Sequence, residues 1–175
     1  MRRAVFLDRD GVINRAIVRE GRPYPPSSLL ELEILPGVFA ALQSLRDANY
    51  LLIVVTNQPD VARGFVSQDV VVELNEYLLS SLPLDEFKTC YHDDGDGCKC
   101  RKPLPGAIIE AAVEHNIDLS KSFMVGDRWR DIAAGQAAGC KTFFINNRYS
   151  EQNPDMPDFI VSSLLEAQQI ILGEF

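Results

Sequence analysis

Short apolar runs alternate along this chain with segments in which apolar residues recur at helical spacing. The first run, residues 4–7, lies almost at the N-terminus and predicts a fully buried central strand. Further runs predict strands at 51–56, 87–91, 123–125, 142–145 and 159–161. Between them, helices are expected over about 35–49, 67–80, 105–116, 131–138 and 163–172. This alternation indicates a Rossmann-like, three-layer α/β/α fold, with a central parallel sheet covered by helices on both faces.

One segment interrupts this alternation. Residues 15–28 contain Gly21, Pro23, Pro25 and Pro26, which exclude a regular helix. We expect an ordered loop that lies over the carboxyl ends of the strands. The chain has no internal repeat, low-complexity tract or linker, so residues 1–175 are expected to form a single domain.

Two carboxylates follow the first strand directly. Asp8 and Asp10 stand where the strand ends, and in open α/β sheets ligands bind outside the carboxyl ends of the strands. Carboxylates this close do not both stay ionised unless a cation lies between them or one holds a proton. That asymmetry suits one as a nucleophile and the other as a proton carrier. The alternative is an ordinary charged turn in which Gly11 supplies a positive φ.

Polar residues also follow other predicted strands. Thr56, Asn57 and Gln58 end the second strand, and Asp127 follows the strand at 123–125. Arg101 and Lys102 stand before Pro103, which favours an extended backbone at Lys102. Each group also has a purely structural explanation. The residues after the strands can form ordinary turns, and Arg101 and Lys102 can be an exposed basic pair. Asp131 can be an acid in the first turn of a helix. Their placement at one edge of one sheet favours a shared site.

Overall charge narrows the possible partners. The chain has a formal net charge of -8, which argues against non-specific binding to nucleic acid or to an anionic membrane. No run approaches the ~20 apolar residues of a membrane span, and the N-terminal run is too short for a signal peptide. We therefore expect a cytoplasmic protein, and we expect it to be a monomer.

Three of the four cysteines cluster with a histidine. Cys90, His92, Cys98 and Cys100 offer three thiolates and one imidazole within eleven residues, enough for a closed tetrahedral Zn²⁺ site. A calcium loop fits poorly, because His92 takes the first ligand position of an EF-hand and Pro103 takes the twelfth. The other alternative is a group of unbound buried thiols. A zinc ion here would pin the loop at about 90–100 that leads into Arg101 and Lys102.

Taken together, the strand-end groups resemble the four motifs of the haloacid dehalogenase (HAD) superfamily phosphatases, in the same order along the chain. The resemblance implies an HAD-like fold and a Mg²⁺ ion held by Asp8, Asp127 and the backbone carbonyl of Asp10. It also implies that Asp8 forms an aspartyl-phosphate and that Asp10 is the general acid and base. Thr56 and Lys102 would stabilise the transferring phosphoryl group.

The thiol cluster between the second and third motifs resembles the heptose bisphosphate and histidinol-phosphate phosphatases within that superfamily. This resemblance implies almost no cap domain and a small phosphorylated sugar as substrate, with removal of the 7-phosphate of D-glycero-D-manno-heptose 1,7-bisphosphate during lipopolysaccharide biosynthesis. Arg22 and Tyr24 are further candidates for the distal phosphate or the sugar. The expected substrate contacts are Asn14, Asn57, Gln58, Arg63, Arg101 and Arg128.

Two departures from that pattern touch the expected substrate contacts. Pro59 and Asp60 replace a pair that is commonly Ser-Gly, and Arg128 stands where lysine is common. The alternative substrates are therefore histidinol phosphate or another small phosphomonoester. An alternative of a different class is a catalytically idle, zinc-stabilised module that binds a phosphorylated ligand in the same pocket.

Overall fold

A six-stranded parallel sheet forms the centre of the molecule in the computed structural model, which describes residues 1–173. The strand order is β5-β4-β1-β6-β7-β8, so the N-terminal strand is central, as its uninterrupted apolar run predicts. The strands are β1 (Arg3–Leu7), β4 (Tyr50–Asn57), β5 (Glu86–Cys90), β6 (Phe123–Gly126), β7 (Lys141–Ile145) and β8 (Phe159–Val161).

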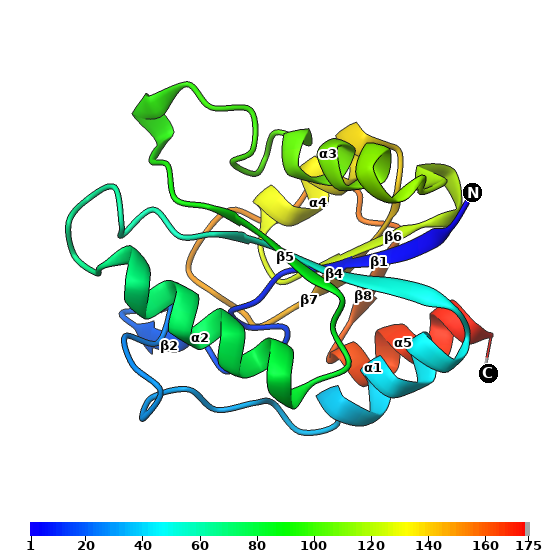
Figure 1. The fold of residues 1–175 in the computed structure, drawn as a ribbon, viewed down its shortest axis with the longest axis horizontal. Coiled ribbons are helices and arrows are strands. Elements are labelled where there is room, and N and C mark those ends of the chain that lie inside the picture. Colours follow the sequence, from blue (N-terminus) through cyan, green and yellow to red (C-terminus); the bar gives the residue numbers. More distant parts are fainter. Residues whose placement is uncertain (174–175) are drawn as a thin grey trace.

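Helices cover both faces of this sheet, which confirms the three-layer α/β/α prediction (Figure 1). On one face lie α1 (Val38–Asp47), α2 (Gln68–Ser81) and α5 (Leu164–Leu172), and on the other lie α3 (Gly106–His115) and α4 (Trp129–Ala138). Two short 3-10 helices, η1 (Asp94–Asp96) and η2 (Leu119–Lys121), complete the helical elements. No helix in the described part of the chain has the length and apolar character needed to cross a membrane.

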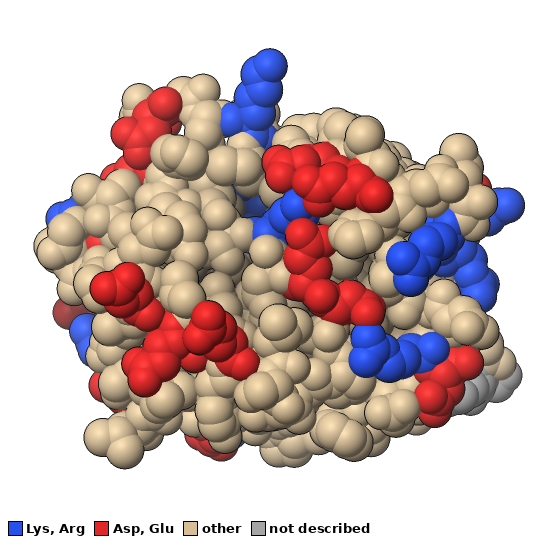
Figure 2. Space-filling view, in the orientation of Figure 1, with Lys and Arg blue, Asp and Glu red and all other residues tan. Residues whose placement is uncertain are grey.

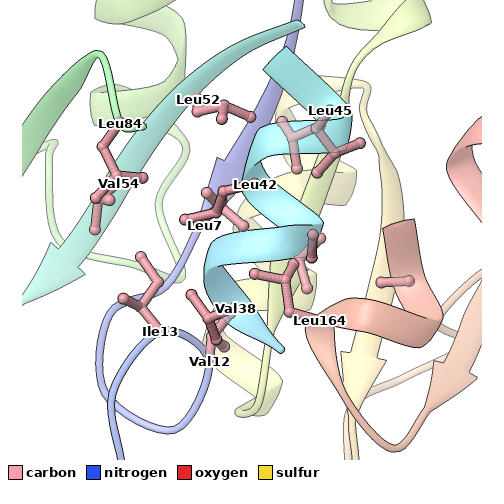
Figure 3. Packing of buried hydrophobic residues seen from close by; sticks show 14 of the residues in the cluster. Leu7, Val12, Ile13, Val38, Leu42, Leu45, Leu52, Val54, Leu84 and Leu164 are labelled. Carbon is pink, nitrogen blue, oxygen red and sulfur yellow. The ribbon is translucent and has the colours of Figure 1, made fainter. Parts of the chain in front are cut away.

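The two faces of the sheet are packed differently. Under α1, branched side chains interdigitate, with Leu42 and Leu45 of the helix against Leu7 and Leu52 of the strands (Figure 3). On the opposite face small residues let the helices approach closely. A Cβ on Gly135 of α4 would lie 2.6 Å from the Met124 Cβ of β6, so only glycine fits there. This close packing fixes the start of α4 relative to the end of β6.

Most predicted helix boundaries agree with the structure within two residues. Ser67 caps α2 as predicted, because its Oγ accepts the backbone N–H of Val70. The fourth helix begins at Trp129 rather than at Asp131. The reason is local: Asp131 Oδ2 accepts the backbone N–H groups of Asp127 and Arg128, which satisfies donors at the helix start.

The segment at 15–28 is only partly the irregular loop that its prolines suggested. It contains an antiparallel hairpin of β2 (Ile17–Arg19) and β3 (Arg22–Tyr24). Glu20 and Gly21 connect these strands with φ values of 50° and 74°, the left-handed pair that a tight two-residue hairpin needs. The prediction of an irregular loop was wrong here, because the prolines exclude a helix whereas a two-stranded ribbon tolerates proline at an edge.

Candidate active site

The pairing of β1 with β6 brings two predicted site residues together. Leu7 pairs with Val125, and the backbone N–H of Asp8 donates to the Val125 carbonyl over 2.9 Å. Asp8 and Asp127 therefore leave the sheet side by side. Together with Asp131 they form an acidic cluster, because one carboxylate oxygen from each lies within 4.8 Å of the others. All three residues are buried.

Lys102 is the cation that the protein supplies to this cluster. Its Nζ donates to Asp8 Oδ1 over 2.7 Å and to the Val55 carbonyl over 2.6 Å, and it lies 2.7 Å from Asp131 Oδ1. Burial lowers the pKa of Lys102, but the carboxylates of Asp131 and Asp8 more than offset this and hold it above its usual value. The lysine therefore stays protonated.

One ammonium group does not neutralise three carboxylates. Burial, followed by the charge of Asp131, raises the pKa of Asp8 to about 6. Burial and the charges of Asp8 and Asp131 raise the pKa of Asp127 well above its usual range. Asp127 Oδ1 is buried and has no hydrogen-bond partner among residues 1–173. An excess of negative charge and an unpartnered carboxylate oxygen fit a hard divalent cation such as Mg²⁺.

Asp10 is held beside this cluster by several donors. Arg9 Nη2 and Gln58 Nε2 donate to its Oδ2, and Asn14 Nδ2 donates to its Oδ1 over 3.0 Å. Arg9 is itself fully buried and donates to Asn75. The side chains of Asn14 and Gln58, which sequence reasoning expected at the substrate, therefore contact Asp10. They hold its carboxylate at the cavity wall.

The residues at the end of β4 support the same site. Thr56 is buried, and its Oγ1 accepts from Gln58 Nε2 over 2.9 Å. Asn57 clamps the backbone of Lys102: its Nδ2 donates to the Lys102 carbonyl over 2.9 Å, and its Oδ1 accepts the Lys102 N–H over 3.1 Å. The amide of Asn57 thereby fixes the loop from which the lysine enters the acidic cluster.

A polar cavity of about 420 Å³ opens over these residues. Asp8, Asp10 and Lys102 line it, and so do five arginines: Arg22, Arg63, Arg101, Arg128 and Arg130. The five arginines gather at one place although the whole chain is acidic, and carboxylates such as Asp94 and Glu151 line the same cavity. Such a cavity suits a ligand with more than one anionic group.

Four of the five arginines are paired with carboxylates. Arg63 makes two hydrogen bonds of 2.7 Å to Asp93. Arg101 and Arg130 share Asp94, at 2.8 and 3.1 Å. Arg128 is paired with Glu151, which raises the pKa of the guanidinium. Of these five arginines, Arg22 alone has no carboxylate partner within residues 1–173, which leaves its charge available to a ligand.

The predicted thiol cluster, Cys90, His92, Cys98 and Cys100, is assembled in the structure. His92 Nδ1 lies 3.5 Å from Cys90 Sγ and 3.4 Å from Cys100 Sγ, and the Cys90 and Cys98 sulfurs are 3.8 Å apart. The cysteines are free thiols, and burial raises the pKa of Cys90 to about 12. Three sulfurs and one imidazole at these distances fit a tetrahedral Zn²⁺ ion, which would also offset the cost of forming the thiolates.

A third group of possible metal ligands has a different explanation. Glu86, Glu114 and His115 lie close enough to hold an ion, but Lys88 Nζ already contacts Glu86 at 3.1 Å and Glu114 as well. The lysine supplies the positive charge. Figure 2 shows that basic and acidic side chains lie next to one another at several places on the face in view.

The sequence did not identify one member of the acidic cluster and two residues that contact it. Asp131 was considered only as a first-turn acid, although its spacing of four from Asp127 returns its side chain to the strand end. Asn147 and Tyr149, in the loop after β7, contact Asp127 Oδ2 at 3.1 and 2.7 Å. No sequence signal identifies these two, because only the folded sheet brings that loop to β6.

Comparison with known proteins agrees with this geometry. A family model described as HAD-hydrolase-like matches residues 99–167. A D-glycero-beta-D-manno-heptose-1,7-bisphosphate 7-phosphatase from Pasteurella multocida is 34% identical over 187 aligned residues, covering 99% of this chain and 98% of the relative. The chain belongs to the HAD-like phosphatases. The predicted superfamily is thereby confirmed.

Further relatives extend the likeness. The enzyme of the same name from Helicobacter pylori strain J99 is 38% identical to this HAD-like phosphatase. The alignment covers 87% of this chain and 85% of the relative. Among solved structures, the heptose 1,7-bisphosphate phosphatase from B. bronchiseptica, described as complexed with magnesium and phosphate, superposes with a TM-score of 0.84. It is 27% identical, and the alignment covers 99% of each chain.

Proposed function

We propose that this HAD-like phosphatase removes the 7-phosphate of D-glycero-D-manno-heptose 1,7-bisphosphate with the help of Mg²⁺. The observation that carries the proposal is the buried acidic cluster of Asp8, Asp127 and Asp131 around Lys102, at the floor of a cavity lined by arginines. Relatives that share about a third of its residues over nearly the whole chain carry this activity in their names.

The residues supply the parts of a two-step phosphoryl transfer. Asp8 attacks phosphorus in line, the bond from phosphorus to the sugar oxygen breaks, and an aspartyl-phosphate forms. Asp10 donates its proton to the departing sugar oxygen and then takes a proton from the water that releases phosphate. Lys102 and Thr56 stabilise charge on the phosphoryl oxygens. Asp10 suits its role because its position is held by Gln58 and Asn14.

Asp8, Asp127 and the backbone carbonyl of Asp10 would hold the Mg²⁺ ion. When bound, the ion reduces the repulsion between a phosphate dianion and the carboxylate nucleophile. The unpartnered Oδ1 of Asp127 and the raised pKa values of Asp8 and Asp127 support this assignment. Lys102 alone leaves the cluster negatively charged.

We also propose a structural Zn²⁺ ion in the thiol cluster. The loop between His92 and Cys98 carries Asp93 and Asp94, whose carboxylates pair with Arg63, Arg101 and Arg130 at the polar cavity. Fixing this loop would therefore fix the positions of the arginines that line the cavity.

Arg22 is our choice for the phosphate that stays on the sugar. It lines the cavity and has no carboxylate partner in the part of the chain that the structure describes, whereas Arg63, Arg101 and Arg128 are each paired with an acid. Tyr24, on the same hairpin, also lines the cavity and would contact the sugar. The hairpin would thus take over part of the role that a cap domain has in other phosphatases.

The direct test is phosphate release from heptose 1,7-bisphosphate in the presence of Mg²⁺, with phosphorus NMR to identify the phosphate that is lost. We expect turnover that Asp8→Asn abolishes, and a higher turnover than on histidinol phosphate. Preference for histidinol phosphate would favour the alternative substrate. Absence of turnover on both and on p-nitrophenyl phosphate would favour a phospho-ligand-binding module.

We propose a monomer that acts in the cytoplasm, as a step of lipopolysaccharide biosynthesis, without nucleic acid or membrane as a partner. The formal net charge of -8 supports the last point. Light scattering after size exclusion tests the oligomeric state.

A further inference from the structure

Two side chains from the loop after β7 contact the carboxylate of Asp127. Tyr149 donates its hydroxyl hydrogen to Asp127 Oδ2 over 2.7 Å, and Asn147 Nδ2 lies 3.1 Å from the same oxygen. Asn147 Nδ2 also lies 3.0 Å from the Gly11 carbonyl and 3.1 Å from the Tyr149 hydroxyl. The amide and the phenol thus connect the loops that follow β1, β6 and β7.

Because of these contacts, the two carboxylate oxygens of Asp127 have different surroundings. Oδ2 is occupied by both donors, whereas Oδ1 is buried and unpartnered within the described chain. A Cβ on Gly11 would lie 1.8 Å from Oδ2 and 2.7 Å from the Tyr149 hydroxyl, so the backbone at Gly11 closes the same side. The carboxylate cannot turn without losing both hydrogen bonds or meeting this backbone.

We propose that Tyr149 and Asn147 are positioning residues, which hold Asp127 so that its Oδ1 is presented to a divalent cation. The inference rests on the Mg²⁺ dependence proposed above. Groups that bind the second oxygen of a metal-binding carboxylate fix its orientation, and their loss typically lowers metal affinity by about 10–100-fold.

The two residues are suited to a test because neither belongs to the apolar core. Asn147 is exposed and Tyr149 is partly exposed, in a loop of β7. Tyr149→Phe removes one hydroxyl and keeps the ring, and Asn147→Ala removes the second donor. Tyr77→Phe, on the outer face of α2, is the matched control, since it removes a hydroxyl from a tyrosine that is 46% exposed.

The measurement is the dissociation constant for Mg²⁺ by titration calorimetry on each full-length variant, with the melting temperature in EDTA as a check on the fold. We expect Tyr149→Phe to weaken Mg²⁺ binding about 10-fold. Its melting temperature in EDTA reports whether the variant folds, and its kcat at saturating Mg²⁺ should change little, because the hydroxyl acts through Asp127. Tyr77→Phe should bind Mg²⁺ as the wild type does.

Equal Mg²⁺ affinity in Tyr149→Phe and wild type would overturn the inference while leaving the proposed function intact. If Tyr149→Phe fails to fold, Asn147→Ala decides: weaker Mg²⁺ binding supports the positioning role, and unchanged binding overturns it. Absence of Mg²⁺ binding by the wild type would overturn the proposed function, and the inference with it.

Discussion

Asp8→Asn is expected to stabilise the metal-free protein at pH 7 while abolishing its activity. The ionised carboxylate of Asp8 is buried beside Asp131 and Asp127, and within residues 1–173 Lys102 is the one cation paired with this cluster, which it does not neutralise. Its pKa rises from 3.8 to about 6. Each pKa unit corresponds to about 1.4 kcal/mol, so the ionised group costs the fold about 3 kcal/mol at pH 7. Asparagine keeps an acceptor for Lys102 without that charge.

The pH dependence of the free energy of unfolding tests the direction of this effect separately. Between pH values of about 4 and 6 the folded state holds a proton on Asp8 that the unfolded state has released, so wild-type stability falls as the pH rises through this window. The variant lacks this change. Its advantage over the wild type should therefore shrink by about 1 kcal/mol between pH 7 and pH 5.

The assay is urea denaturation in EDTA at both pH values. Asp69→Asn is the control, because it removes an exposed acid at the start of α2 and should change the free energy of unfolding by less than about 0.5 kcal/mol. A variant less stable than wild type at pH 7, or one whose advantage is the same at pH 5, would refute the reasoning.

Three further predictions follow from the same contacts. Lys102→Met leaves the carboxylates of Asp8 and Asp131 without their partner and should lower the free energy of unfolding in EDTA by about 3–5 kcal/mol, measured with urea. Gly11→Ala places a Cβ 1.8 Å from Asp127 Oδ2 at a φ of +89°, so kcat/KM should fall about 100-fold or more. Zinc removal by a chelator should lower the melting temperature of the wild type, and Cys98→Ser should lower it by a similar amount without chelator. Equal melting temperatures of the wild type with and without chelator would contradict a structural zinc.

Much of the fold could be predicted because its sheet is buried on both faces. Such strands are uninterrupted apolar runs, and the helices between them carry one apolar face. The hairpin of β2 and β3 was missed because it is short, exposed and built on a turn of Glu20 and Gly21 rather than on apolar side chains. Its pattern contains no buried face from which a strand could be recognised.

Part of the candidate site could likewise be predicted from the sequence, and part could not. Asp8, Asp127 and Lys102 could be predicted because each follows a strand or a conspicuous loop motif, and the parallel sheet brings such ends together. The contacts of Asn147 and Tyr149 could not, since they depend on how the loop after β7 folds back over β6. The pairing of the arginines with Asp93, Asp94 and Glu151 is likewise tertiary.

The central claim is that the carboxylate of Asp8 becomes covalently phosphorylated during turnover. Acid quenching of the enzyme with heptose 1,7-bisphosphate and Mg²⁺, followed by peptide mass spectrometry, measures this directly. The account predicts one added phosphoryl group on the N-terminal peptide at Asp8, absent in Asp8→Asn and absent without Mg²⁺. Phosphate release at an unchanged rate by Asp8→Asn, or a phosphoryl group on another residue, would contradict it.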